Sequence, residues 1–150
     1  MKIRFWNMKY TTFIVLFILI LFFNNITIAK DKEKIVIIGS YRKFYEQINR
    51  KIELFEKNNF IVLMPPKSKI INPNDEFVKF QHEENKTIKE IEESFLNAIK
   101  IADFVYIFNP NGYIGSSSAF EIGFSYGLKK KIYCMEKPQD LILENTCEVR

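Results

Sequence analysis

The chain has 150 residues, of which 47% are hydrophobic and 15% aromatic. These values favour one folded domain and exclude a disordered or low-complexity protein. The net charge of +4 arises from the first thirty residues, which hold four basic side chains and no acidic one; the other 18 of the 22 basic residues balance 18 acidic ones. Nucleic-acid binding needs clustered positive charge and is therefore not predicted. One histidine, His82, and two cysteines are too few for a typical zinc site, so we expect no metal and no cofactor.

Residues 1–30 have the pattern of a secretion leader. Basic residues precede an apolar run over 13–23, and Ala29 is a small residue at a candidate cleavage site. The alternatives are an uncleaved membrane anchor over residues 11–29 or a mis-called start. With the basic residues kept inside, a signal peptide or an anchor places the domain at 31–150 outside the cytoplasm, whereas a mis-called start leaves it in the cytoplasm. Outside the cytoplasm Cys134 and Cys147 either pair as a disulfide or remain thiols, and the sequence leaves both open.

Apolar runs and helical spacings then alternate along the chain. A buried strand is predicted at 34–40 and a second one at 60–64. Between them, apolar residues at helical spacing predict a helix that ends at Asn58; they are Phe44, Ile48, Ile52 and Phe55. The polar segment 67–86 has the length of a lid or binding loop. The remaining predicted elements are, in chain order, a helix at 87–102, a strand at 103–108, a Gly/Ser-rich loop at 109–118, a helix at 119–128 and a strand at 132–135. A fifth strand is predicted to start at 141–143.

This alternation predicts a three-layer α/β fold with a flavodoxin-like, Rossmann-type parallel sheet of four or five strands. Such sheets bind ligands beyond the carboxyl ends of the strands, where the strand order reverses. With strand order 2-1-3-4, the reversal lies between the first and third strands. The loops at 39–42 and 109–118 are therefore predicted to form the site.

The first loop reads Gly39-Ser40-Tyr41-Arg42. Glycine permits a tight turn, the serine and backbone N–H groups bind anions, and the arginine can form two hydrogen bonds to a phosphate. The competing interpretation of Arg42 is a solvated side chain at the start of a helix.

The second loop precedes a helix whose free N–H groups attract anions, so a phosphate or a sugar is the expected ligand. The alternative is a polar loop with a helix cap. The candidate binding residues are Asn109, Gly112, Tyr113, Gly115, Ser116, Ser117 and Ser118.

Glu121 has two interpretations. Ser118 and Glu121 have the spacing of a capping box, in which the serine caps the helix and the glutamate bonds back to the cap. A carboxylate at the mouth of the sheet can instead attack an anomeric carbon as a nucleophile. Among the other acids, Glu90, Glu92 and Glu93 fit the solvated face of their helix, although Glu93 and Asp103 are candidates to point toward the site.

The stretch ADFVYIFNPNGYIGSSSAFEIGFSYGLKKKIY, residues 102–133, resembles the nucleoside 2-deoxyribosyltransferase-like superfamily. GSYR after the first strand is similar to the phosphate-binding turn of its 2′-deoxynucleoside 5′-phosphate N-hydrolase branch, and residues 72–140 resemble a poorly characterised bacterial subgroup. The resemblance implies an oligomeric enzyme that acts on the N-glycosidic bond of deoxynucleosides or their monophosphates. It places the nucleophile on Glu121 and phosphate contacts on Ser40, Arg42 and 115–117.

The sequence departs from this family where an acidic residue of the enzymes falls on Phe95. Glu93 is the candidate substitute for the acid that protonates the leaving base. The leading hypothesis is an N-glycosidase or deoxyribosyltransferase. The alternatives are a non-catalytic nucleotide-binding module, exported or anchored, and a structural domain in which Ser118 and Glu121 only cap a helix.

Overall fold

The structure is a computed structural model that describes residues 31–150. The predicted leader at 1–30, whether a signal peptide or an anchor, lies outside the described residues. Within the described part of the chain, no helix is both long and apolar enough to cross a membrane.

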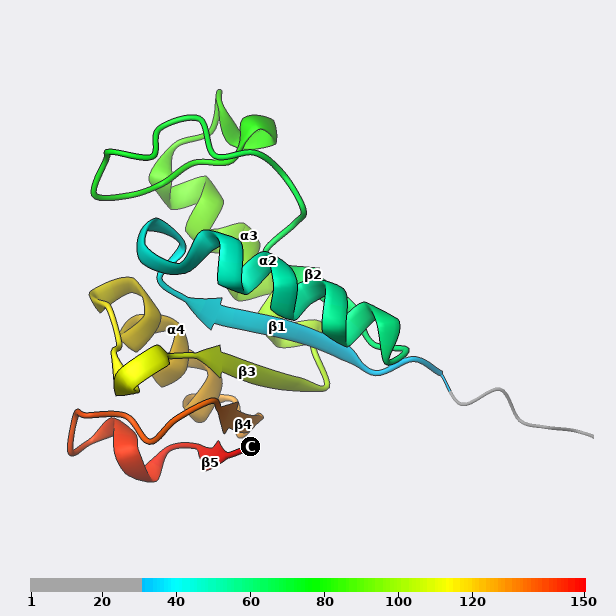
Figure 1. Cartoon of the computed structure of the whole chain (residues 1–150), viewed down its shortest axis with the longest axis vertical. Helices are drawn as coiled ribbons and strands as arrows, with labels where there is room; N and C mark the ends of the chain where they lie inside the picture. Colours follow the sequence, from blue (N-terminus) through cyan, green and yellow to red (C-terminus); the bar gives the residue numbers. More distant parts are fainter. Residues whose placement is uncertain (1–30) are drawn as a thin grey trace, which may run out of the picture. The chain divides into compact units, whose positions relative to one another are not determined.

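Five parallel strands form one sheet (Figure 1). They are β1 (Lys34–Gly39), β2 (Ile61–Met64), β3 (Phe104–Phe108), β4 (Lys131–Cys134) and β5 (Glu148–Val149), in the order β2-β1-β3-β4-β5. This order confirms the flavodoxin-like prediction, including the reversal between β1 and β3.

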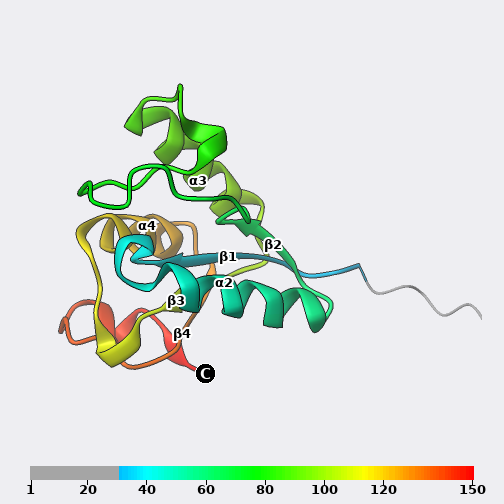
Figure 2. The same cartoon turned by 45° about the horizontal axis from the view of Figure 1, so that its top comes forward.

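The helices cover both faces of the sheet and make three layers (Figure 2). They are α2 (Tyr41–Lys57) on one face and α3 (Ile88–Ile101) and α4 (Ser116–Gly127) on the other. Successive side chains of β1 alternate between the two cores. Ile35 and Ile37 pack with Ile48 of α2, whereas Val36 and Ile38 belong to the core that includes Ile122 of α4.

Two strand predictions were wrong in detail. The strand at 60–64 was expected to be buried, but β2 lies at the edge of the sheet and Ile61 is 39% exposed. The fifth strand was expected at 141–143, where the chain instead makes a turn. Asp140 Oδ1 accepts hydrogen bonds from the backbone N–H groups of Ile142 and Leu143, and this local alternative to strand pairing displaces β5 to 148–149.

Residues 65–86 form a long connection, here called the strap, that leads from β2 to α3 and is drawn in green in Figure 1. Within the strap, Ile70 and Phe80 pair through an antiparallel bridge, and a 3-10 turn follows at Gln81–Glu83. The hydroxyl of Tyr45 on α2 donates to Ser68 O at 2.7 Å, and Phe80 is buried. The strap is therefore packed onto the domain.

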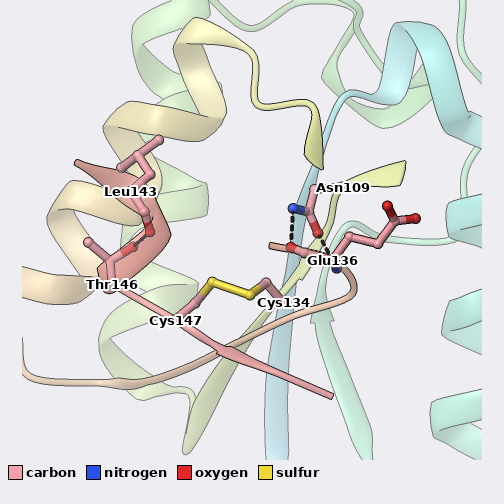
Figure 3. The surroundings of a disulfide bond; sticks show 6 residues. All are labelled: Asn109, Cys134, Glu136, Leu143, Thr146 and Cys147. Carbon is pink, nitrogen blue, oxygen red and sulfur yellow. Dashed lines mark hydrogen bonds between the residues drawn. A yellow bond between two sulfur atoms is a disulfide. The ribbon is translucent and has the colours of Figure 1, made fainter. Parts of the chain in front are cut away.

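Cys134 and Cys147 form a disulfide (Figure 3), which decides between the alternatives that the sequence left open. Cys134 ends β4 and is fully buried, and Cys147 directly precedes β5. The bond therefore fastens the short edge strand β5 to the body of the sheet.

Candidate functional site

A cavity lies beyond the carboxyl ends of β1 and β2, between these strand ends, the loop after β3, α3, α4 and the strap. Both predicted loops contribute to it, but Met64 and Pro65 at the end of β2 line it as well, and no residue of β3 does. Ten residues singled out in the sequence line it: Gly39, Ser40, Tyr41, Arg42, Tyr113, Gly115, Ser116, Ser117, Ser118 and Glu121.

Two other candidates from the second loop have structural contacts instead. The side chain of Asn109 is buried, donates to Glu136 O at 2.6 Å and accepts from Glu136 N at 3.1 Å (Figure 3). Gly112 has φ +68°, and a Cβ there would lie 2.5 Å from Lys137 O. Both residues therefore hold the loop against the segment after β4, and neither lines the cavity.

The acidic candidates Asp103 and Glu93 do not reach the cavity. Asp103 precedes β3, at the end of the sheet opposite the cavity, and its Oδ2 accepts from Lys34 N at 2.7 Å. The Glu93 side chain is 57% exposed and lies 3.8 Å from Lys89 Nζ. The prediction that Glu93 supplies the missing acid is therefore wrong, because its position on α3 faces solvent.

Glu121 is a buried cavity residue and not a capping residue. Helix α4 begins at Ser116 with Gly115 as its N-cap and without a side-chain cap, so Ser118 lies inside the first turn and Glu121 in the second. The capping-box interpretation is wrong because the helix starts three residues earlier than expected. Glu121 is only 6% exposed. Its burial, and then the nearby charge of Glu92, raise the pKa of the Glu121 carboxyl well above its usual range.

Glu92 is the acid that α3 presents to the cavity. Its Oε1 is buried and has no hydrogen-bond partner within residues 31–150. Burial raises the pKa of this carboxyl. The prediction that Glu92 lies on the solvated face of its helix is therefore wrong. The available signal was its spacing, because Glu92 precedes Phe95 by one helical turn and Phe95 also lines the cavity.

The strap contributes two further glutamates that sequence reasoning missed, the buried Glu83 and the exposed Glu76. Glu83 is only 2% exposed, lines the cavity, and accepts a hydrogen bond from Phe80 N at 2.9 Å through Oε2. Phe77, Val78 and Phe80 of the strap line the same cavity. The predicted lid or binding loop therefore lies at the site.

Tyr41 marks the point where the acidic groups converge. Its hydroxyl donates to Ile37 O at 2.7 Å, and its ring centroid lies 5.7 Å from that of Phe80 and 6.4 Å from that of Phe95. Burial raises the pKa of the Tyr41 phenol well above its usual value, with added contributions from the charges of three glutamates, first Glu121 and then Glu83 and Glu92. The cavity therefore combines an aromatic wall, three neighbouring carboxylates and a Gly/Ser-rich rim. Within residues 31–150, no three His, Cys, Asp or Glu side chains are grouped as a metal site requires.

Comparison with known proteins gives similarity in fold. No protein-family model matches the chain, and no curated protein matches it in sequence. Among solved structures, the chain is similar to a CMP N-glycosidase of Clostridium botulinum, with a TM-score of 0.53 and 14% identity over 79% of this chain and 85% of that one. A 2-deoxyribosyltransferase of Bacillus psychrosaccharolyticus has a TM-score of 0.47 and 15% identity over 72% of this chain and 75% of that one. The chain thus shares the α/β fold of the Clostridium botulinum protein.

Proposed function

We propose that this protein cleaves or transfers the N-glycosidic bond of 2′-deoxynucleosides or their 5′-monophosphates, with Glu121 as the nucleophile. The observation that carries the proposal is the pairing of two carboxylates in one cavity, Glu121 buried on α4 and Glu92 on α3 with an unpartnered buried oxygen. Paired carboxylates of this kind perform glycosyl transfer by covalent catalysis. The fold shared with a CMP N-glycosidase and the resemblance of residues 102–133 support the same chemistry.

In the first step a carboxylate oxygen of Glu121 forms a bond to C1′ of the sugar as the bond from C1′ to the base nitrogen breaks. Glu92 donates its proton to the leaving base, so that the base departs neutral and Glu92 becomes a carboxylate. In the second step water, or the nitrogen of an acceptor base, attacks C1′ and releases Glu121. The proton of the attacking group returns to Glu92, and the site regains its starting state.

The electrostatics couple the two carboxyl groups, and burial raises the pKa of Glu121 more than that of Glu92. Each is held in surroundings that disfavour its charged form, and the charge of Glu92 raises the pKa of Glu121. One proton shared by such a pair lets one member be ionised while the other is an acid. The reactive form is therefore the less populated one, in which the shared proton lies on Glu92. Protonated Glu92 no longer opposes the ionisation of Glu121, so the two roles are compatible.

The 5′ end of the substrate is assigned to the rim of the cavity. Ser40 and Arg42 follow β1, and Ser116–Ser118 form the first turn of α4, where N–H groups are free. Hydroxyl, guanidinium and N–H donors suit a 5′-hydroxyl or a 5′-phosphate.

The second candidate function is a non-catalytic nucleotide-binding module. The observation in its favour is Phe95, which lines the cavity at the place where the related enzymes carry an acid. This candidate predicts nucleotide binding without release of base.

The deciding experiment measures free base by chromatography after incubating the purified full chain with a panel of 2′-deoxynucleosides and their 5′-monophosphates. Wild type is compared with Glu121→Gln, and with Glu93→Gln as a matched surface control. We expect release that requires Glu121 and survives Glu93→Gln, and dependence on an added acceptor base separates transfer from hydrolysis. Release that persists in Glu121→Gln contradicts the nucleophile assignment, and saturable binding without release favours the binding module.

We also infer that the domain works outside the cytoplasm. The leader pattern at 1–30 and the disulfide between Cys134 and Cys147 support this location, because structural disulfides persist mainly in oxidising compartments. Fractionation of cells, combined with thiol labelling of the two cysteines, tests it. Oxidised cysteines in an exported fraction are expected, and labelled thiols in a cytoplasmic fraction would refute it.

A further inference from the structure

Glu83 is the buried carboxylate of the cavity for which the proposed reaction has no use. Burying a carboxylate is costly unless hydrogen-bond donors surround it. Within the described residues, Oε2 has the N–H of Phe80 at 2.9 Å, whereas Oε1 has only the ring nitrogen Nε2 of the half-exposed His82, at 3.6 Å. That separation is too long for a hydrogen bond. Glu83 therefore has unused acceptor capacity inside a cavity that it lines.

The surroundings of Glu83 indicate what kind of ligand could donate a hydrogen bond to its carboxylate. The ring centroid of Tyr41 lies 5.7 Å from that of Phe80 and 6.4 Å from that of Phe95, so the adjacent wall is aromatic. Aromatic walls favour flat ring systems that stack on them or meet them edge to face. The occupant expected next to Glu83 is a planar ring that carries N–H groups at its edge.

Nucleobases differ in whether the exocyclic group at this edge is a donor. Cytosine, adenine and guanine carry an exocyclic amino group with two N–H donors, and a carboxylate has acceptor sites only. Uracil, thymine and hypoxanthine present a carbonyl oxygen at the corresponding position. That oxygen would face the Glu83 carboxylate with no proton between them, and the buried acceptor would remain unsatisfied.

We propose that Glu83 is a specificity-determining residue that selects substrates whose base carries an exocyclic amino group. The inference rests on the proposed function for its reaction, but base selection and catalysis are separable. Glu121 and Glu92 act at the glycosidic bond, whereas Glu83 reaches the cavity from the strap. The strap is thus the element that contacts the base and determines which bases are accepted.

The alternative role for Glu83 is purely local. Its contact with Phe80 N resembles a helix cap and stabilises the 3-10 turn at Gln81–Glu83. Glu83→Gln separates the two roles, because the amide oxygen can still accept from Phe80 N while an NH2 group, a donor, replaces the second carboxylate oxygen. Selection of the base would change with this substitution, and local capping would not.

The test compares kcat/KM for two matched pairs, 2′-deoxycytidine with 2′-deoxyuridine and 2′-deoxyadenosine with 2′-deoxyinosine, using the purified full chain. We expect the amino-bearing member of each pair to be favoured about ten-fold or more, since a site built around a substrate N–H strongly rejects the analogue that lacks it. In Glu83→Gln the preference should vanish or reverse. Glu84→Gln, an exposed neighbour on the same turn, should keep it. Equal use of both members by wild type, or an unchanged preference in Glu83→Gln, overturns the proposal while leaving base release intact.

A binding measurement separates failure of this proposal from failure of the proposed function. The thermal unfolding temperature of the wild-type chain is measured with free cytosine or uracil, and with adenine or hypoxanthine. A larger rise with the amino-bearing base of each pair supports selection by Glu83 even if no substrate is turned over. Equal rises, or none, refute it. The wild-type comparison holds regardless of whether Glu83→Gln folds.

Discussion

The wall of the cavity built by α4 consists of residues next to strand ends, whereas the opposite wall is built by α3 and the strap from positions 76–95. The first wall holds the Gly115–Ser118 rim and Glu121, directly after β3 and its loop. The second holds Glu83, Glu92 and Phe95, whose places depend on the rotation of a helix and the path of a long connection. The comparison shows that strand order is enough to locate the residues of one wall. Which residues form the other wall depends on how α3 and the strap pack against the sheet.

The two walls also differ in how their helices begin. Helix α3 starts with a complete capping box, in which Thr87 accepts from Glu90 N and the Glu90 carboxylate accepts from Thr87 N. These bonds lower the pKa of Glu90. Helix α4 starts without any side-chain cap, so its first N–H groups remain free for a ligand. The uncapped helix is the one whose N-terminus faces the cavity.

The largest expected effect is a difference in kcat between substitutions of two neighbouring acids on α3, Glu92 at the cavity and Glu93 at the surface. Glu92→Gln should lower kcat for base release by about 10²–10⁴-fold, the usual contribution of a general acid, because no proton then reaches the leaving base. Glu93→Gln is the matched control and should keep kcat near wild type. An N7-methylated purine deoxynucleoside, whose base carries a positive charge before cleavage and so departs neutral without a proton, should restore much of the rate to Glu92→Gln but none to Glu121→Gln. Equal losses on both substrates would remove Glu92 from the reaction as a proton donor.

The pH dependence of kcat/KM tests how the protonation of Glu121 on one wall is linked to that of Glu92 on the other. Activity needs Glu121 ionised and Glu92 protonated, so the profile should be bell-shaped. Because burial raises both pKa values, the fall on the alkaline side should lie above the usual carboxyl range. Glu92→Gln should lose that alkaline fall. A profile for this variant that still falls at the same pH would show that another group controls it.

A change in the anchor of the α4 wall should destabilise the fold. Asn109→Ala removes both hydrogen bonds to the backbone of Glu136 and leaves partly buried groups without partners. We expect the free energy of unfolding to fall by about 1–3 kcal/mol. Urea unfolding followed by circular dichroism measures it. Asn97→Ala, at an exposed position of α3, is the control, and a loss in Asn109→Ala no larger than in the control would contradict the anchoring role.

Glu121→Gln should raise the stability of the chain, and more so at higher pH. The Glu121 carboxyl has a folded-state pKa above its unfolded value, so its contribution to stability is fully present below the unfolded pKa. That contribution is lost as pH rises through the folded pKa, where a charge must be buried. Thermal unfolding at pH 5 and pH 8 should therefore show a larger gain for Glu121→Gln at pH 8. A gain that does not grow with pH would mean that the carboxyl is not desolvated.

The smallest expected effect compares the first turns of the two helices. Thr87→Ala removes the cap of α3 and should cost about 1 kcal/mol. Ser118→Ala should change stability by less than about 0.5 kcal/mol, because Ser118 is not a cap. Urea unfolding of both variants tests this contrast. A loss in Ser118→Ala equal to that in Thr87→Ala would restore the capping interpretation of Glu121.

The candidate site was predicted unevenly from the sequence. Loop residues such as Ser40 and Gly115 line the cavity, and the sequence could point to them because they follow strands whose order can be derived from apolar runs. Asn109 and Gly112 belong to the same loop but face the segment after β4, a contact between residues 27 positions apart. Glu93 was predicted to supply the acid only because it lies close to Phe95 in sequence. A shift of one residue along a helix turns a side chain by about 100°, and this turn brings Glu92, not Glu93, to the cavity.

By itself the sequence determined the α/β class, the parallel sheet, its reversal point and the loops that meet there. These follow from local hydrophobic periodicity and from the right-handed connections that parallel strands require. Only the tertiary structure decided where α4 begins, whether Cys134 and Cys147 pair, and which glutamates share the cavity. The physical reason is that burial and charge at Glu83, Glu92 and Glu121 depend on how α4 packs against the continuous segment formed by the strap and α3. These two parts lie apart in sequence and meet only when the chain is folded.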